Sequence, residues 1–343
     1  IRSVCFPMAP SPAAAATSFL VKSVLFRFSK NGSLIGSKLA ECVIKSNKRL
    51  TYEQAMLFLK ESNLDRIRDA KPPPSRYSGN PGRPLRDLSD KELTELRGAI
   101  GTLWKIASGI RKLRMKGGSL DLESSEVKIL VDDKGEPEEI RQSESDESHH
   151  LIEEFMLLAN ETVAMELRKK KLPGMFRVHP DPDPEDLEEL RSFVSIFGIS
   201  CGELSSRKEV NKMLTLINKH ALAQVLRIKF LRSLKQACYR NAPDGHYGLA
   251  KRDYLHFTSP IRRYADLVVH RIVEKILRRQ KIGKADREKM DGLAKHLSVT
   301  ERNSVDAERE SIKDKLLLYY RRDLNKIPPV RHKAIITEIG RRG

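Results

Sequence analysis

The sequence has few cysteines, and their spacing excludes two common kinds of framework. Its four cysteines are scattered through 343 residues and include no Cys-x-x-Cys pair. Structural metal sites and disulfide frameworks need cysteines in close, patterned spacing. The sequence therefore predicts free thiols in a reducing compartment.

Long apolar runs are also absent. No stretch without charged residues approaches the roughly 20 residues that span a bilayer, so we expect no membrane association. The apolar segment 13–26 is interrupted by Lys22 and lacks the ordered zones of a secretory signal. The sequence contains neither HExxH nor GxGxxG, the signatures of zinc proteases and dinucleotide-binding folds. The first residue is Ile1 rather than Met, and we therefore expect a fragment or a processed chain.

Positive charge is what the sequence has in excess. Lys and Arg number 64 against 46 acidic residues, which gives a formal net charge of +18. Such an excess indicates a polyanionic partner, with nucleic acid ahead of an anionic membrane. The alternative is a basic but passive surface. The basic residues cluster inside periodic segments, as expected for faces of folded elements: 169–171, 227–240, 278–284, 321–326 and 331–333.

Hydrophobic periodicity predicts an α+β fold. Two alternating runs flank Asn31-Gly32, which is a strong hairpin signal, and a second strand pair is expected around 133–135. Thr51 can cap one helix, and Ser89 with Glu92 has the spacing of a capping box. Residues 69–90 form a long loop rich in Pro, Gly and Arg. Helices are expected over 51–62, 89–116, 148–171, from 184, and over 207–238, 260–280 and 286–325.

The stretch HFTSPIRRYADLVVHR, residues 256–271, combines a helix start with two adjacent arginines. Ser259 is a good N-cap, and Pro260 is well tolerated at the first helical position. The apolar side chains that follow then fall on one face at helical spacing. They are Ile261, Ala265, Val268, Ile272 and Ile276.

The two arginines suggest an anion site at this helix start. Arg262 is expected at the edge of the buried face, and Arg263 further out. Free N–H groups at a helix N-terminus and a forked guanidinium together suit a phosphate. The alternative is a purely structural pair between Arg262 and Asp266, four residues apart.

A second candidate lies in SHHLIEEFMLLANETV, residues 148–163. Helical rotation places Glu154 beside the buried face and Glu153 nearly opposite. A carboxylate at that edge can serve a metal, a water or an arginine, or it is only a solvated helix charge. His149 and His150 are interpreted as polar residues at the helix start, and Glu308, taken alone, as part of a solvated face.

These segments resemble a known family. HFTSPIRRYADLVVHR is similar to the signature of the ribonuclease II and ribonuclease R family. HYGLA at 246–250, ESHHLIEEFMLLANETVA at 147–164, RLTYEQA at 49–55 and FRVHPDPDPEDLEEL at 176–190 match in order and spacing. The resemblance covers about residues 19–325. It implies an RNB-type catalytic domain with a mixed sheet and many helices over 1–327, N-terminally incomplete. The first strand of an OB-type RNA-binding barrel would follow at 330–343.

The resemblance also implies an activity and roles for individual residues. The expected parent is a Mg²⁺-dependent, processive 3′→5′ exoribonuclease that degrades single-stranded RNA to nucleoside 5′-monophosphates, as a monomer in the cytoplasm or an organelle. Arg262 would hold the phosphate at the cut site, with Ser259 and Arg263 as neighbouring substrate contacts. Tyr52 would stand by the RNA 3′ end and Glu154 by the terminal nucleotide. Glu308 would lie near the product end, as a further catalytic residue.

The sequence departs from the family pattern in two places. The family holds its metal with a cluster of aspartates well before RLTYEQA, but no Asp or Glu precedes Phe19 in this chain. The Mg²⁺ ligands are therefore expected upstream of Ile1. A base-clamping aromatic of the family falls near Ile129. A non-catalytic RNA-binding relative without the metal site is the alternative, and a basic helical scaffold without specific RNA binding is a third.

Overall fold

The computed structural model describes residues 18–45, 48–71, 83–122, 126–143, 145–332 and 334–336. The chain divides into two compact units. The first consists of Ile1–Leu120, Ser145–Pro180 and Ala237–Leu297, and the second of Asp121–Glu144, Asp181–Gln236 and Ser298–Gly343. Helices together with antiparallel strand pairs confirm the predicted α+β class. The predicted division into 1–327 and 330–343 does not coincide with these units and stays a prediction.

The first unit begins with the predicted hairpin. Strand β1 (Ser18–Phe28) pairs antiparallel with β2 (Leu34–Lys45). Gly32 takes a φ of +85°, which side chains with a Cβ rarely adopt. The turn is closed by a hydrogen bond from the backbone N–H of Ser29 to the carbonyl oxygen of Ser33, at 2.9 Å. The Asn-Gly signal therefore predicted both the hairpin and its turn.

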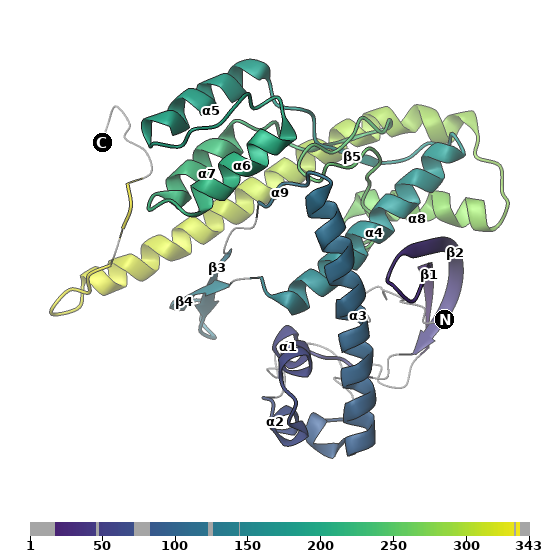
Figure 1. Ribbon diagram of the computed structural model, residues 1–343, viewed down its shortest axis with the longest axis horizontal. Coiled ribbons are helices and arrows are strands. Elements are labelled where there is room, and N and C mark those ends of the chain that lie inside the picture. Colours follow the sequence, from purple (N-terminus) through teal and green to yellow (C-terminus); the bar gives the residue numbers. More distant parts are fainter. Residues whose placement is uncertain are drawn as a thin grey trace. The chain divides into compact units, whose positions relative to one another are not determined.

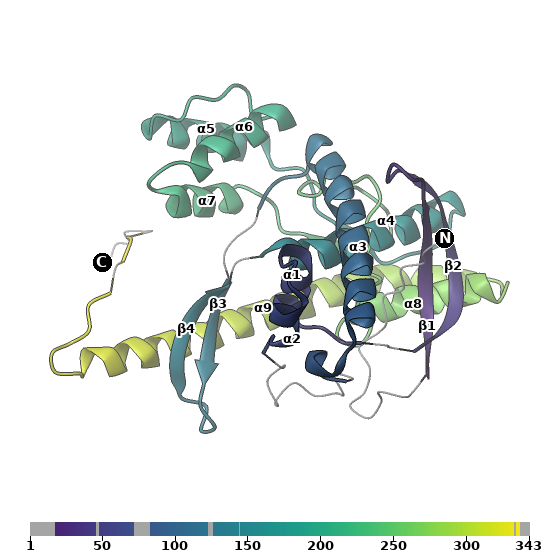
Figure 2. The ribbon, with the colours of Figure 1, turned by 60° about the horizontal axis from the view of Figure 1, so that its bottom comes forward.

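Two capped helices follow. Thr51 and Gln54 form a capping box at the start of α1 (Tyr52–Lys60), and the predicted box of Ser89 and Glu92 begins α3 (Asp90–Lys116). Short helices α2 (Leu64–Arg68) and η1 (Leu85–Asp87) lie between them. Helix α1 buries Gln54 and Phe58. Helix α3 crosses α4 (Glu147–Lys169), and α1 packs against both (Figures 1 and 2).

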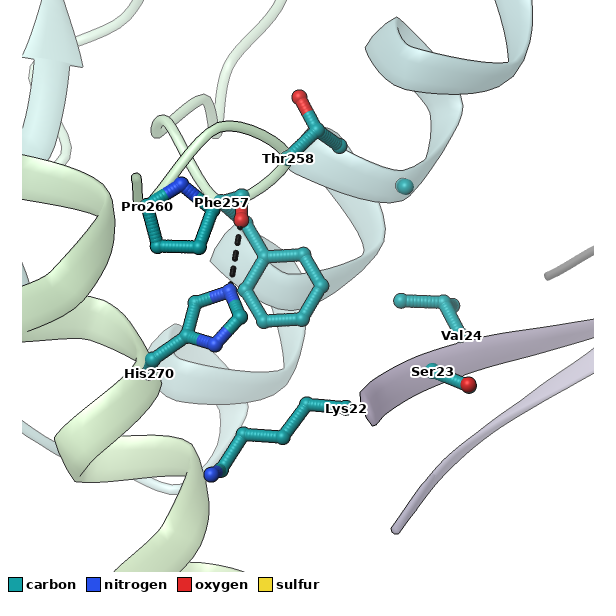
Figure 3. A pocket seen from close by; sticks show the side chains of 8 residues that line it. Lys22, Ser23, Val24, Phe257, Thr258, Pro260 and His270 are labelled. Atoms are coloured by element: carbon teal, nitrogen blue, oxygen red, sulfur yellow. Dashed lines mark hydrogen bonds between the residues drawn. The ribbon is translucent and has the colours of Figure 1, made fainter. Parts of the chain in front are cut away.

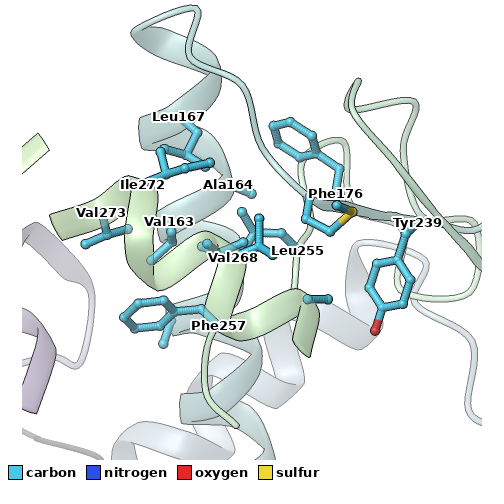
Figure 4. Close-up of a cluster of buried hydrophobic side chains, with 14 of the residues drawn as sticks. Val163, Ala164, Leu167, Phe176, Tyr239, Leu255, Phe257, Val268, Ile272 and Val273 are labelled. Carbon is cyan, nitrogen blue, oxygen red and sulfur yellow. The ribbon is translucent and has the colours of Figure 1, made fainter. Parts of the chain in front are cut away.

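The main core of the first unit fixes α4 against α8 (Tyr264–Leu277). Leu167 of α4 and Val269 of α8 are completely buried in it. Strands β5 (Phe176–Val178) and β6 (Cys238–Arg240) pair beside the two helices and contribute Phe176 and Tyr239 (Figure 4). Each large apolar side chain buried there stabilises the fold by about 1.5–3 kcal/mol. This packing holds in place the loop that precedes α8.

The second unit contains a hairpin and a group of helices. Strand β3 (Glu126–Val131) pairs with β4 (Pro137–Ser143), as predicted. Helices α5 (Pro184–Ile196), α6 (Arg207–Asn218) and α7 (Ala223–Arg232) pack through buried apolar faces. The helix expected over 207–238 is thus two helices. Between them the His220 ring accepts the N–H of Leu222 at 3.0 Å, a local bond that competes with the helical ladder.

Helix α9 (Lys284–Leu324) confirms the long helix predicted near the end of the chain (Figure 1). From Ser298 onward it belongs to the second unit, where two of its cations bind the β3–β4 hairpin. Lys315 Nζ donates to the carbonyl oxygen of Gly135 at 2.6 Å, and Arg322 Nη1 to that of Pro137 at 2.7 Å. The cluster of basic residues at 321–326 is therefore partly structural.

Two sequence predictions fall partly outside the described residues. Within 330–332 and 334–336 the chain forms no strand, and the rest of the strand expected over 330–343 is not described. Most of the loop expected at 69–90, residues 72–82, is also not described. None of the helices in the described ranges combines the length and the apolar composition that crossing a membrane requires.

Candidate nucleic-acid site

The loop before α8 differs from the helix start that the sequence predicted. Helix α8 begins at Tyr264, so Ser259 is not its N-cap and Pro260 is not its first residue. Instead, the backbone N–H groups of Arg262 and Arg263 both point to the carbonyl oxygen of Ser259, at 3.3 and 3.1 Å, and close a turn. Ile261, expected on the buried face, is 61% exposed.

A buried carboxylate explains this turn. Asp266 has no exposed surface, and its Oδ1 accepts the backbone N–H of Ser259 at 2.7 Å. The side chain of Asp266 therefore reaches back seven residues and fixes Ser259 outside the helix. Local capping rules favour Ser259 as a cap, but the buried charge needs hydrogen bonds more than the helix end does.

The two adjacent arginines have different surroundings. Arg263 forks onto Asp266, with Nε 2.8 Å from Oδ2 and Nη2 3.0 Å from Oδ1. The structural pair considered from the sequence therefore exists, but it uses Arg263 rather than Arg262, and the expectation that Arg263 points further out is wrong. Arg262 is exposed, and its side chain has no hydrogen bond or ion pair with the residues that the structure describes. Of the two, Arg262 is the guanidinium that an anion can reach.

Two side chains, one from α4 and one from α8, bind the backbone of the loop. Asn160 Oδ1 accepts the backbone N–H of Phe257 at 2.9 Å. The Nε2 of His270 donates to the carbonyl oxygen of Phe257 at 2.8 Å, and the two rings stack (Figure 3). Burial lowers the pKa of His270, which keeps the ring neutral. The loop is therefore held on its α4 and α8 sides, just ahead of Arg262.

A small cavity lies beside this brace, between Lys22, Thr258 and His270 (Figure 3). Its volume is about 20 Å³. That is room for one water molecule and excludes a nucleotide. The candidate site is therefore the exposed surface around Arg262 and not this cavity.

The histidines near the loop stand in a positive environment. The pKa of His256 lies well below its usual value because of burial first, and then because of Arg263 and Arg177. Burial and the neighbouring His179 and Arg177 lower the pKa of His246 to about 3. Both rings are therefore neutral at physiological pH. The arginines that add to the effect of burial also favour a polyanion.

Glu154 is buried in an ion pair. It has no exposed surface, whereas the side chain of Glu153 is 44% exposed, as helical rotation predicted. Arg114 binds Glu154 with Nε 3.1 Å from both carboxylate oxygens and Nη2 2.5 Å from Oε1, and Arg111 lies 3.7 Å away. The sequence left open whether Glu154 serves a metal, a water or an arginine, and the structure shows an arginine. The contact of Glu154 with a terminal nucleotide stays a prediction.

Tyr52 is half-exposed and stacks on another ring. Its ring lies 3.9 Å from that of His149, with an angle of 16° between the planes. Nδ1 of His149 is 2.8 Å from Oδ1 of Asp146, the residue that caps α4. Burial acts to raise the pKa of Asp146, but hydrogen bonds from Ser148 and His149 lower it on balance. His149 is thus more than the polar helix-start residue that the sequence suggested.

The remaining predicted residues belong to the second unit. Glu308 is exposed on α9, and Ile129 pairs with Ile140 in the β3–β4 hairpin. Their roles stay predictions. Within the described residues no group of three or more His, Cys, Asp or Glu side chains is placed to hold a metal ion. The described residues therefore do not fit a Mg²⁺ site.

An exposed arginine on a braced turn, neutral histidines behind it and a net charge of +18 define a class. This is a basic α+β protein with an exposed guanidinium that an anion can reach. The sequence matches the RNB domain over residues 5–279. That match covers most of the chain, which therefore belongs to the RNB-domain family, and the resemblance drawn from the motifs is confirmed.

The relatives are ribonucleases R and proteins that share their fold. Ribonuclease R of Thermotoga maritima is 32% identical over 334 residues, which cover 94% of this chain and 43% of that protein. Ribonuclease R of Mycoplasma genitalium, solved with ribose-methylated single-stranded RNA, is 25% identical with a TM-score of 0.75, and the match covers 89% of this chain and 45% of that one. A yeast pseudonuclease, 20% identical with a TM-score of 0.57 over 83% of this chain and 32% of its own, shares the fold. The chain thus spans less than half the length of these proteins.

Sequence reasoning missed two residues that build the site and assigned a third to the wrong partner. Asn160 and His270 bind the loop backbone, which no side-chain pattern reveals. Asp266 was paired with the wrong arginine. The available signal was an acid at helical spacing from the two arginines. Only the observed start of α8 shows that Asp266 pairs with Arg263.

Proposed function

We propose that this chain is part of an exoribonuclease of the ribonuclease R type that degrades single-stranded RNA from its 3′ end. The observation that carries the proposal is the pair of arginines before α8. Asp266 neutralises Arg263, while Arg262 is exposed and has no side-chain partner among the described residues. Membership of the RNB-domain family supports it, and so does the RNA in the Mycoplasma genitalium structure.

Arg262 holds the phosphate at the bond that is cut. A guanidinium offers forked donors to two phosphate oxygens and stabilises the negative charge that develops there. Ser259 and Arg263, predicted as substrate contacts, act in this proposal through the turn that presents Arg262. The backbone N–H of Ser259 and the guanidinium of Arg263 both donate to the carboxylate of Asp266.

Tyr52 stands by the 3′ end of the RNA in this proposal. His149 covers one face of its ring, and the residue is 44% exposed in total. Aromatic rings on which bases stack are the usual means of binding single strands without sequence preference. In this proposal Glu154 acts near the terminal nucleotide through the arginines that bind it, and Glu308 acts near the product end.

The products, processivity and Mg²⁺ dependence rest on the family resemblance. Products would be nucleoside 5′-monophosphates, and Mg²⁺ would activate water and stabilise the leaving oxygen. The described residues do not fit a metal site, so the roles proposed for Arg262, Tyr52 and Glu154 involve no metal ligand. A monomer and a cytoplasmic location are further expectations.

A second candidate is RNA binding without cleavage. The observation behind it is the lack of a fitting metal site among the described residues. The same arginine would then bind phosphate without contributing to a reaction. The two candidates share their substrate and differ only in whether the RNA is shortened.

One experiment separates them. The chain is mixed with 5′-labelled single-stranded RNA and Mg²⁺, and both the bound fraction and the length of the labelled strand are followed. Arg262→Met is the test variant. Lys105→Met, which removes a positive charge from an exposed position of α3, is the charge-matched control.

Stepwise shortening from the 3′ end that falls about 10²–10³-fold in Arg262→Met, with a smaller loss of binding, supports the exoribonuclease. Binding without shortening would mean that this chain by itself holds no catalytic metal, which supports the second candidate for the chain as given. Shortening would also mean that carboxylates of this chain hold the metal. Failure to bind RNA, or equal behaviour of both variants and the unaltered chain, contradicts the role given to Arg262.

A further inference from the structure

Asp266 is a buried carboxylate that the proposed chemistry does not use. It lies in the first turn of α8 and has no exposed surface. Three hydrogen bonds converge on it, one from the backbone of Ser259 and two from the guanidinium of Arg263. A buried charge is tolerated only when it is paired and hydrogen-bonded, so the positions of Ser259 and Arg263 follow from that of Asp266.

Arg262 lies between the two residues that Asp266 holds. Its own backbone N–H points to the carbonyl oxygen of Ser259, at 3.3 Å. The turn from Ser259 to Arg263 is thus fixed at both ends, and Arg262 is the exposed cation in it. Phe257, two residues before the turn, is fixed by Asn160 and His270. The backbone that carries Arg262 therefore cannot shift without breaking a bond to a buried group.

The ion pair between Arg263 and Asp266 also leaves only one of the two adjacent arginines with an uncompensated charge. Two adjacent free guanidinium groups would attract the same phosphate in several geometries. With Arg263 neutralised by Asp266, one geometry remains. A site that is ordered before binding loses little conformational entropy when the ligand arrives. Alignment of the reacting group also raises the rate.

We propose that Asp266 is a positioning residue that makes Arg262, and not Arg263, the ligand of the RNA phosphate. It acts by holding Ser259 and Arg263 in one turn and touches no substrate itself. The proposal rests on the proposed function, since it requires Arg262 to bind phosphate. It assigns Asp266 a role in recognition beyond the stability of the fold.

A double-mutant cycle tests the proposal on the whole chain. The variants are Arg262→Met, Asp266→Asn and the double variant. Asparagine keeps an acceptor for the N–H of Ser259 but removes the charge that holds Arg263. The affinity for a fluorescently labelled single-stranded RNA is measured in EDTA at several salt concentrations, and thermal unfolding is measured alongside. Lys105→Met again controls for the loss of one charge.

We expect Arg262→Met to weaken binding about tenfold or more, as the loss of a charge-assisted hydrogen bond implies. It should also reduce the slope of log affinity against log salt by about 0.7, the value for one phosphate contact to a single strand. Asp266→Asn should weaken binding by a similar factor when Arg262 is present. In the Arg262→Met background this loss should disappear, and the released Arg263 should leave the affinity unchanged or raise it.

An equal effect of Asp266→Asn in both backgrounds would overturn the proposal, because a general loss of structure does not depend on Arg262. If Arg262→Met leaves affinity and salt slope unchanged, the proposed phosphate contact fails first and the positioning role with it. Should Asp266→Asn not fold, the cycle is carried out with His270→Ala and His270→Gln. Glutamine can still donate to the carbonyl oxygen of Phe257, so it should restore binding, and equal losses in both would count against the brace.

Discussion

At the scale of single residues, Glu154 illustrates how a predicted substrate contact can also be a structural charge. Its carboxylate is fully buried and is matched by Arg114, whose side chain is only 8% exposed. Arg114 also donates to Ser119 Oγ at 2.7 Å. The pair therefore ties α3, α4 and the segment after α3 together, whatever it does with RNA.

We expect Glu154→Ala to lower the free energy of unfolding by about 3–5 kcal/mol, because it leaves the Arg114 cation buried without its main partner. Glu153→Ala is the matched control. Its side chain is 44% exposed and lies 3.5 Å from Arg114, so the loss should be under about 1 kcal/mol. Urea denaturation followed by circular dichroism measures both, and equal losses would show that burial of the pair is not what stabilises it.

A second expectation at this scale concerns pH. The pKa of His246 is about 3 because of burial first, and then because of His179 and Arg177, whereas an unfolded histidine titrates near 6.5. Between those values the unfolded chain binds the extra proton. Folding stability is therefore complete above pH ~6.5 and falls as the pH drops toward 3, by up to about 1.4 kcal/mol per pH unit for this one group.

The measurement is urea denaturation between pH 7 and 4.5, with His246→Gln beside the unaltered chain. The variant lacks the titrating ring, so its stability should depend less steeply on pH. His296→Gln, which removes an exposed histidine of α9, is the control. The same steepness in His246→Gln and the unaltered chain would contradict the assignment.

At the scale of elements, the features that the sequence predicted correctly are those governed by neighbours in the chain. The hairpin of β1 and β2 follows from Asn31-Gly32, and the starts of α1 and α3 follow from capping boxes. Each of these signals lies within four residues of the structure it determines. Nothing from elsewhere in the fold opposes them, so local preference and final structure agree.

The start of α8 shows why the rest could not be predicted. Ser259 and Pro260 satisfy the local rules for a helix start, but the Asp266 carboxylate takes the N–H of Ser259. The helix begins four residues later than Pro260, at Tyr264. Once the start moves, residue 262 is no longer one helical turn before Asp266, and Arg263 takes the place predicted for Arg262. The assignment of the two arginines therefore depended on a buried charge that the pattern does not reveal.

At the scale of the whole molecule, the charge of +18 overstates what is available to RNA. Basic residues occupy the last turns of α3, α4 and α9, where they interact favourably with the helix dipole. Others donate to backbone carbonyl oxygens, such as Lys315 to Gly135 at 2.6 Å. Part of the excess therefore serves the fold, and only the remainder can displace counterions from a nucleic acid.

This distinction predicts the salt dependence of RNA binding. Each phosphate contact to a single strand contributes about 0.7 to the slope of log affinity against log salt. If every excess charge were used, the slope would approach about −13 on that rule. We expect a slope of about −3 to −6, equivalent to roughly four to eight phosphates, because the cations that bind carbonyl oxygens or lie at helix ends do not take part. Fluorescence anisotropy between about 50 and 300 mM salt, conditions chosen to span the steep range, measures it. A slope near zero would instead favour the basic helical scaffold that binds no RNA specifically, since phosphate contacts must weaken as salt rises.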